Sequence, residues 1–337
     1  MNRFFSGFSK VTAVVLLVFL TCGPAMSAEF VLRFGATVQE DSASGISMTD
    51  YFKPYVEENS NGRISVEVYL NSVLGGDRQL YESLQMNTVQ ASFGPTSVLA
   101  NFEPNYSIVD APFIFKDKET AYAALDGEFG AMLAKNLPNV GMRVLGYGEN
   151  AFRNISNSAR PITTMEDMQG LRIRVMEAHV YIETIRALGG NATPMAFSEL
   201  YTALQQGTVD GQDNGVVLTY TARLHEVLKY YTFTEHCYAA NAYVFSEEFL
   251  RSLPDDLLKV LEDGTYYALT HQRRLNTEME EELIKIIEES GVQVNRLSNE
   301  EKARWQEATA SVIDGLAGTV SPEILEAARK INEVYGK

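Results

Sequence analysis

Cysteine is scarce in this sequence, which has only two among its 337 residues, Cys22 and Cys237. Cys22 lies in an N-terminal segment that we expect to be removed from the mature protein. Cys237 would then have no partner for an internal disulfide. The mature chain would therefore depend on its hydrophobic core for stability, and its length is sufficient for a large core.

Positive charge is also scarce, because 28 Lys and Arg residues stand against 44 Asp and Glu residues, a formal net charge of −16. A general nucleic-acid binder needs a basic surface, so we expect no nucleic-acid partner. Hydrophobic residues make up 45% of the chain and charged residues 21%, which is typical of a globular protein and not of a disordered one. The length predicts about two domains.

Motifs for catalysis and nucleotide binding are missing. The sequence has no G-x-G-x-x-G, Walker loop, G-x-S-x-G, H-E-x-x-H or C-x-x-C, and no two of its four histidines have metal-ligand spacing on one helix. We therefore expect a protein that is not an enzyme and that needs no metal and no cofactor. An exported lyase or hydrolase is the alternative.

Residues 1–28 have the layout of a secretory signal peptide. Arg3 and Lys10 give a positive start, residues 11–20 form an apolar run, and small residues follow where cleavage is expected. A spanning helix needs roughly 20 apolar residues, so this run is too short, and no other segment is long and apolar enough. A periplasmic protein is the expected outcome. An uncleaved anchor and a lipoprotein modified at Cys22 are the alternatives.

Strand-like and helix-like segments alternate along most of the chain. Strand patterns cover residues 31–36, 63–70, 89–93, 142–147, 171–175 and 209–212. Helical patterns cover residues 44–58, 77–87, 116–137, 179–188, 199–206, 255–290, 299–317 and 322–335. This alternation predicts an α/β protein with parallel or mixed sheets.

Local signals predict several helix ends. Asp77 and Ser198 stand at N-cap positions, and Thr163 begins a capping-box spacing with a Glu three residues later. Pro54 should kink or end the helix that contains it.

Residues 255–290 predict one long helix with an acidic, exposed face. At 1.5 Å per residue it would be roughly 50 Å long, enough to cross more than one domain. Two shorter helices separated at Gly264 are the alternative.

The few arginines are placed informatively. Arg172 and Arg174 are two residues apart on a predicted strand, so both point to one face. Arg153 begins another strand-like run. Two arginines on one face could hold a carboxylate in a bidentate fork, but they could equally be ordinary surface residues.

Three consecutive blocks resemble one protein family. These are residues 168–175 (MQGLRIRV), 194–207 (PMAFSELYTALQQG) and 209–214 (VDGQDN). In this order and composition they resemble the solute-binding proteins of tripartite ATP-independent periplasmic (TRAP) transporters. Shorter matches in the right order are residues 32–35 (LRFG), 74–78 (LGGDR) and 111–115 (APFIF). The resemblance covers nearly the whole mature chain.

The resemblance implies an α/β fold of two domains, joined by crossing strands and a long helix, that closes on its ligand like a venus flytrap. Domain I would comprise residues 29–150 with about 240–280, and domain II residues 151–239 with about 281–337. The implied partners are a small organic acid and the membrane permease subunits, and a monomer is expected. A periplasmic subunit that presents its ligand to a signalling receptor is the alternative role.

The resemblance also implies roles for individual residues. Arg174 would form the salt bridge to the ligand carboxylate, and Arg153 would assist it. Asn214 would reach the ligand, and Phe197 would pack against it. A planar guanidinium matches a carboxylate, and an amide can donate to and accept from hydroxyls.

Other positions are weaker carry-overs from the family. Positions that vary with the ligand are Thr37, Asp77, and His236 or Tyr238, although Asp77 is also explained as a helix cap. Further polar groups that could hold hydroxyls are Gln90, Glu149 and Asp213. They favour a hydroxylated acid, such as a uronate or aldonate, over a C4-dicarboxylate or a keto acid. Pro95 replaces a Glu of sialic-acid-binding members, which disfavours sialic acid.

Overall fold

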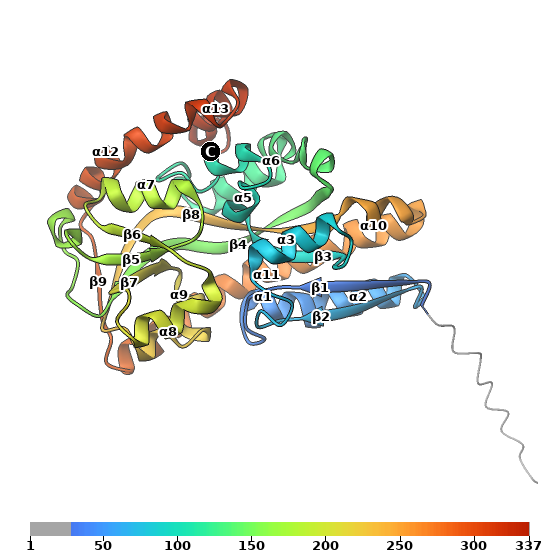
Figure 1. Ribbon diagram of the computed structural model, residues 1–337, viewed down its shortest axis with the longest axis horizontal. Helices are drawn as coiled ribbons and strands as arrows, with labels where there is room; N and C mark the ends of the chain where they lie inside the picture. The colour runs from blue at the N-terminus through green and yellow to red at the C-terminus, as the bar shows by residue number, and fades with distance from the viewer. Residues whose placement is uncertain (1–27, 337) are drawn as a thin grey trace, which may run out of the picture.

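The computed structural model describes residues 28–336, so the expected signal peptide lies, except for Ala28, outside the described residues. Within that range, the structure contains no helix with the length and apolar character needed to cross a membrane. The described chain forms one mixed sheet with helices on its faces, and the long helix α11 (Asp255–Glu289) runs beside it (Figure 1).

A nine-stranded sheet runs through the described part of the molecule. Its strands lie in the order β2-β1-β3-β8-β4-β7-β5-β6, and β9 pairs with β8. β1 pairs in parallel with β2 and β3, and β5 pairs in parallel with β6 and β7. We call β1, β2 and β3 the first half-sheet and β5, β6 and β7 the second half-sheet. The strands are β1 (Phe30–Gly35), β2 (Ile64–Tyr69), β3 (Ala91–Pro95), β4 (Met142–Asn157), β5 (Arg172–Val175), β6 (Asn191–Pro194), β7 (Gly211–Asn214), β8 (Tyr230–Ser246) and β9 (Gln293–Arg296).

The long antiparallel strands β4 and β8 connect the two half-sheets. β8 pairs with β3 through residues 241–245, and β4 pairs with β7 through residues 154–157. The sequence patterns predicted β4 only as far as residue 147 and missed β8. Both strands are largely buried on both faces, so polar and apolar side chains do not alternate along them.

Short helices cover the two faces of the sheet. Pro54 lies in the first turn of α2, directly after the π-helical stretch η1, so the disturbance that Pro54 predicts lies before it. The elements before β5 are α1 (Ala43–Ile46), η1 (Ser47–Phe52), α2 (Lys53–Asn59), α3 (Asp77–Gln85), α4 (Thr96–Leu99), η2 (Pro104–Ile108), α5 (Lys118–Asp126), α6 (Glu128–Ala134), η3 (Leu137–Val140) and η4 (Met165–Met168). Those after β5 are α7 (His179–Ala187), η5 (Phe197–Glu199), α8 (Leu200–Gln205), α9 (Val216–Thr221), η6 (Leu224–Glu226), α10 (Glu247–Ser252), α11, α12 (Asn299–Gly315), η7 (Leu316–Gly318), α13 (Pro322–Arg329) and α14 (Ile331–Val334).

Several predicted helix ends are displaced. The capping box begins at Thr164 and not at Thr163, with Asp167 as its second member. Ser198 lies inside the short turn η5 and does not cap α8. The single helix predicted before β4 is divided into α5 and α6 at Gly127. These errors are of one or two residues or of one break, and they leave the order of elements unchanged.

Helix α11 is continuous over 35 residues, which confirms the prediction of one long helix. Gly264 does not break it. A Cβ at Gly264 would lie 3.0 Å from side-chain atoms of both Tyr55 and Val56, so the glycine allows α2 to pack closely on α11. The same helix contacts η1 and α1 beside the first half-sheet and α9 beside the second. It therefore spans both parts of the molecule.

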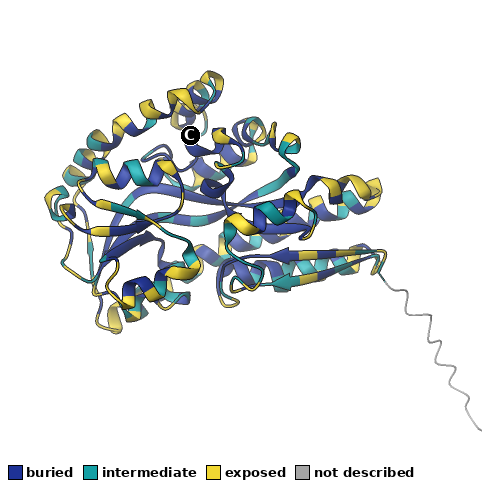
Figure 2. Ribbon diagram, in the orientation of Figure 1, coloured by how far each residue is buried: buried dark blue, intermediate teal, exposed yellow. Residues whose placement is uncertain are grey.

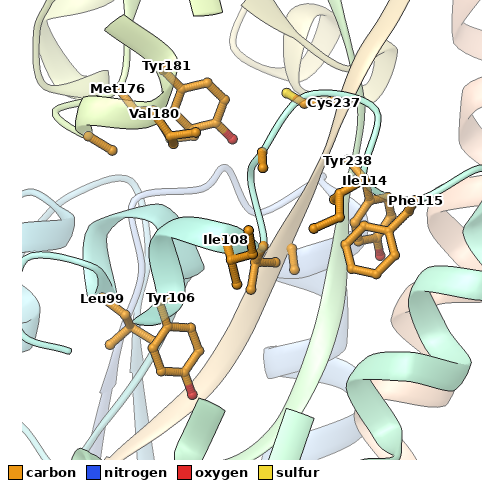
Figure 3. Packing of buried hydrophobic residues seen from close by; sticks show 14 of the residues in the cluster. Leu99, Tyr106, Ile108, Ile114, Phe115, Met176, Val180, Tyr181, Cys237 and Tyr238 are labelled. Atoms are coloured by element: carbon orange, nitrogen blue, oxygen red, sulfur yellow. The ribbon is translucent and has the colours of Figure 1, made fainter. Parts of the chain in front are cut away.

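Buried residues follow the sheet, and exposed residues cover the outer faces of the helices (Figure 2). One large hydrophobic cluster reaches from the α4–η2 region to α7 and α12. Figure 3 shows part of it, where Met176 and Tyr181 lie across from Ile108 and Cys237. The two parts of the molecule thus share a packed interior next to the crossing strands.

Candidate functional site

A pocket lies between the first and second half-sheets, beside β4 and β8. Loops at the ends of β1 and β3 form one side, and residues of β5, β7 and the turn before α8 form the other. The lining residues are Thr37, Val38, Ser42, Ala43, Ser44, Asp77, Phe93, Gly94, Pro95, Asn150, Arg174, Met176, Phe197, Asn214, Val217, Leu218, Asn241 and Asn276. The pocket thus brings together five candidates from the sequence, which are Arg174, Asn214, Phe197, Asp77 and Thr37.

Arg174 is the cation of this lining. It lies on β5, and its side chain is almost completely buried. Its Nε and Nη2 donate to the carbonyl oxygen of Met195 at 2.9 and 2.7 Å, and its guanidinium carbon lies 5.9 Å from the centre of the Phe197 ring. Burial lowers the pKa of Arg174 to about 10, and the nearby charge of Arg153 contributes to this. Its neutral carbonyl partner leaves the positive charge available for an anion.

Asp77 is the anion of the lining and belongs to the opposite side of the pocket. The structure corrects its predicted role as an N-cap, because Gly76 is the N-cap of α3 and Asp77 is the first helical residue. Asp77 Oδ1 accepts a hydrogen bond of 3.0 Å from Thr37 Oγ1. Burial raises the pKa of Asp77 to about 6, against the opposing effects of Thr37 and Arg174. The pocket thus has one charge of each sign.

Four asparagines supply amide groups to the pocket: Asn150, Asn214, Asn241 and Asn276. Each amide can both donate and accept hydrogen bonds, as a hydroxyl does. Hydroxyls of Ser42, Ser44 and Thr37 are also in the lining. The pocket can therefore bind several neutral polar groups of a ligand in addition to one charged group.

Apolar side chains form the remaining wall. They are Val38, Phe93, Pro95, Met176, Phe197, Val217 and Leu218. A wall of this kind suits the C–H groups of a carbon chain or ring, while the amides and hydroxyls fix its orientation. Pro95 offers no carboxylate here.

Arg153 does not belong to the pocket lining but lies in a buried group with Asp213. Arg153 Nε donates to Asp213 Oδ2 at 2.7 Å and Nη2 donates to Oδ1 at 3.1 Å, with both side chains fully buried. His236 Nε2 is 3.6 Å from the same Oδ2. Burial works against both charges, but their mutual attraction outweighs it. This attraction raises the pKa of Arg153 and lowers the pKa of Asp213 to about 2.

This buried group includes the atoms that come nearest to a metal-ligand set in residues 28–336. Ligand atoms of Asp213, His236 and Cys237 all lie within 4.8 Å of one another. Arg153 already bonds both oxygens of Asp213, and burial raises the pKa of the Cys237 thiol well above its usual value. A cation there would oppose an arginine and require a thiolate. The group fits an arginine–carboxylate pair better than a metal site.

Four other sequence candidates lie away from the pocket. The Gln90 side chain accepts from the backbone N–H of Arg33 and donates to Asn87, next to β1. Glu149 pairs with Lys118 at 2.8 Å. Tyr238 packs edge-on against aromatic rings, including that of Phe152. Arg172 is exposed and pairs with Asp210.

Comparison with known proteins identifies the family. The model of the bacterial extracellular solute-binding protein family 7 matches residues 34–318. The chain belongs to this family. It is 32% identical over 313 residues to the C4-dicarboxylate-binding periplasmic protein DctP of Rhodobacter capsulatus, which covers 91% of this chain and 92% of the relative.

Solved structures of TRAP periplasmic solute-binding proteins have the same fold. The sugar acid binding protein of Advenella mimigardefordensis, in complex with galactonate, superposes with a TM-score of 0.88 at 31% identity and covers 91% of this chain and 99% of its own. The protein of Polaromonas sp. JS666 bound to D-erythronate has a TM-score of 0.85 at 33% identity, with 89% and 98% covered. Family 7 proteins bind solutes and are not catalytic.

The sequence reasoning missed three asparagines of this family 7 pocket. Asn276 lies on the face of α11 that also carries Ala268 and Gln272, four residues apart, and all three are buried. Polar residues that recur every four positions on the apolar face of a helix indicate buried polar positions, so the sequence did contain a signal for Asn276. Asn241 similarly interrupts an apolar run on β8. Asn150 carried no signal, because its position depends on an irregularity of β4.

Proposed function

We propose that this protein captures a small polyhydroxylated monocarboxylate, such as an aldonate or a uronate, and delivers it to the permease of a TRAP transporter. The supporting observation is the charge pattern of the pocket lining, which combines one cation, Arg174, with one anion, Asp77, among neutral amides and hydroxyls. Arg174 would hold the ligand carboxylate in a bidentate fork.

The same pattern argues against a dicarboxylate. A second carboxylate would need a second cation, but among the described residues that line the pocket Arg174 is the sole basic side chain. Asp77 would repel a second negative group, whereas it can accept hydrogen bonds from hydroxyls. Relatives differ on this point, since one is named for C4-dicarboxylates and two structures contain galactonate and D-erythronate.

Capture would involve closure of two domains around the ligand. We place domain I at residues 29–150 with about 240–280, and domain II at residues 151–239 with about 281–337. Arg174 and Asn214 would then contact the ligand from domain II, and Asp77 and Thr37 from domain I. A ligand that bridges the two favours the closed form because it makes more contacts there. Export to the periplasm through the predicted signal peptide is consistent with this role.

The test is a titration of protein that has been unfolded and refolded to remove any ligand carried from the cell. Galactonate, D-erythronate and glucuronate should raise the melting temperature and bind in calorimetry, whereas succinate should bind at least tenfold more weakly, since it gains no hydroxyl contacts and meets Asp77. Equal or tighter binding of succinate would contradict the proposal. In Asp77→Asn the repulsion is removed, and the preference against succinate should shrink.

A further inference from the structure

Strand β4 is irregular between the segments that serve the two half-sheets. Its register with β8 shifts between Glu149 and Ala151, so Asn150 has no direct partner on β8. A bulge of this kind bends a strand and redirects a side chain. Here the redirected side chain is that of Asn150, which lines the ligand pocket. The bulge thus lies both at the strand crossing and at the site.

Side chains of helix α11 form hydrogen bonds to the backbone of this bulge, as the backbone of a neighbouring strand would. Gln272 Oε1 accepts from the backbone N–H of Glu149 at 2.9 Å, and Gln272 Nε2 donates to the carbonyl of the same residue at 2.7 Å. One turn later, Asn276 Nδ2 donates to the carbonyl of Asn150 at 3.1 Å. Gln272 is fully buried, so water cannot replace these bonds without opening the contact.

Two glycines allow α11 to come this close. Gly146 and Gly148 are two residues apart on β4 and share one face. A Cβ at Gly146 would lie 2.6 Å from Leu269 Cδ1, and a Cβ at Gly148 would lie 2.9 Å from Leu269 Cδ2 and 3.0 Å from Gln272 Oε1. Side chains there would push the helix away. The close approach is what lets the short side chains of Gln272 and Asn276 reach the β4 backbone.

We propose that Gln272 and Asn276 are positioning residues for ligand capture, which fasten the β4 bulge to α11 and so couple the ligand contact of Asn150 to closure of the two domains. The proposal rests on the proposed function, because it assumes a ligand in this pocket. β4 and α11 both extend along the first and second half-sheets. When they are joined beside the pocket, a ligand that bonds Asn150 and Asn276 stabilises one relative position of both elements.

The first test is Gln272→Met, which keeps the length of the side chain and removes both hydrogen bonds to Glu149. Hydrogen–deuterium exchange of the Glu149 amide in the ligand-free protein should accelerate. The dissociation constant for galactonate should rise about tenfold, and the decrease in radius of gyration on ligand addition should become smaller in X-ray scattering. Gln306→Met, the same change on the exposed face of α12, is the matched control and should alter none of these.

A second variant, Gly146→Ala, changes no residue of the pocket lining and places a Cβ 2.6 Å from Leu269 Cδ1, which pushes α11 away from β4, and it decides the matter if Gln272→Met does not fold. A lower melting temperature with unchanged galactonate affinity and unchanged scattering would overturn the proposal, because a purely structural contact gives that result. If the wild-type protein binds no hydroxylated acid, the proposed function fails. Exchange of the Glu149 amide in the ligand-free variants still decides whether α11 fastens the bulge.

Discussion

Two buried arginines on different strands, Arg174 on β5 and Arg153 on β4, have opposite surroundings. Arg153 is held at both carboxylate oxygens of Asp213, so its charge is balanced inside the protein. Arg174 bonds a neutral carbonyl, and its pKa is lowered by burial and by Arg153. A buried arginine without an anionic partner is costly for the empty protein. The difference shows which of the two is available to a ligand anion.

The comparison refines the family-based expectation that both arginines serve the carboxylate. Arg153 can act on the site without touching the ligand, because its charge and its bonds to Asp213 fix the residue that precedes Asn214 on β7. We therefore propose that Arg174 contacts the ligand and that Arg153 supports β7. Variants at the two positions should affect different measurements.

The largest effect is expected from Asp213→Asn, which leaves Arg153 buried without its charged partner. Breaking a buried pair by removing one member costs about 3–5 kcal/mol, so the free energy of unfolding from urea titration should fall by that order. The double variant Arg153→Met with Asp213→Leu should recover most of the loss. Unchanged stability with abolished binding would instead mean that Arg153 holds the ligand directly.

The next effect concerns Arg174→Lys, which should weaken binding of the hydroxylated acid about 100-fold, or roughly 3 kcal/mol, with little change in stability. Lysine keeps the charge but cannot form two parallel hydrogen bonds to a carboxylate. Arg172→Lys is the control, since Arg172 lies on the same strand, is exposed and pairs with Asp210. Equal affinities for both variants by calorimetry would remove Arg174 from the ligand site.

The two arginines also show how far the sequence predicts the structure. The block containing Arg174 has a strand period and a family motif, so its strand and its place in one pocket with Phe197 and Asn214 could be anticipated. The pairing of Arg153 with Asp213 could not, because it depends on the register between β4 and β7, two strands more than fifty residues apart. Register is set by the packed sheet and not by local pattern.

The same limit applies elsewhere in the molecule. The long helix was predictable, since 35 residues of helical pattern outweigh one glycine. The bulge at Asn150 was not, and neither was the place of Glu149 and Gln90 outside the pocket. Glu149 and Gln90 carry polar side chains, and the sequence alone cannot distinguish such side chains from ligand contacts. Only their neighbours, Lys118 for Glu149 and the β1 backbone for Gln90, show what they bind.

The smallest effect is a pH dependence that arises from Asp77, the anion across the pocket from Arg174. Its pKa is raised to about 6 in the folded protein, so between about pH 4 and pH 6 the folded state binds more protons at this residue than the unfolded state. The contribution of Asp77 to stability is therefore present below about pH 4 and is lost as the pH rises to about 6.

The Asp77→Asn variant lacks this pH-dependent contribution to stability. The unfolding free energy of Asp77→Asn minus that of the wild type, from urea titrations in ligand-free protein, should become more positive from pH 4 to pH 6 and stay constant above about pH 7. Titrations of all other groups are common to both proteins and cancel in the difference, so a flat difference across this range would show that the pKa of Asp77 is not raised and that its carboxylate is as well solvated as a surface one.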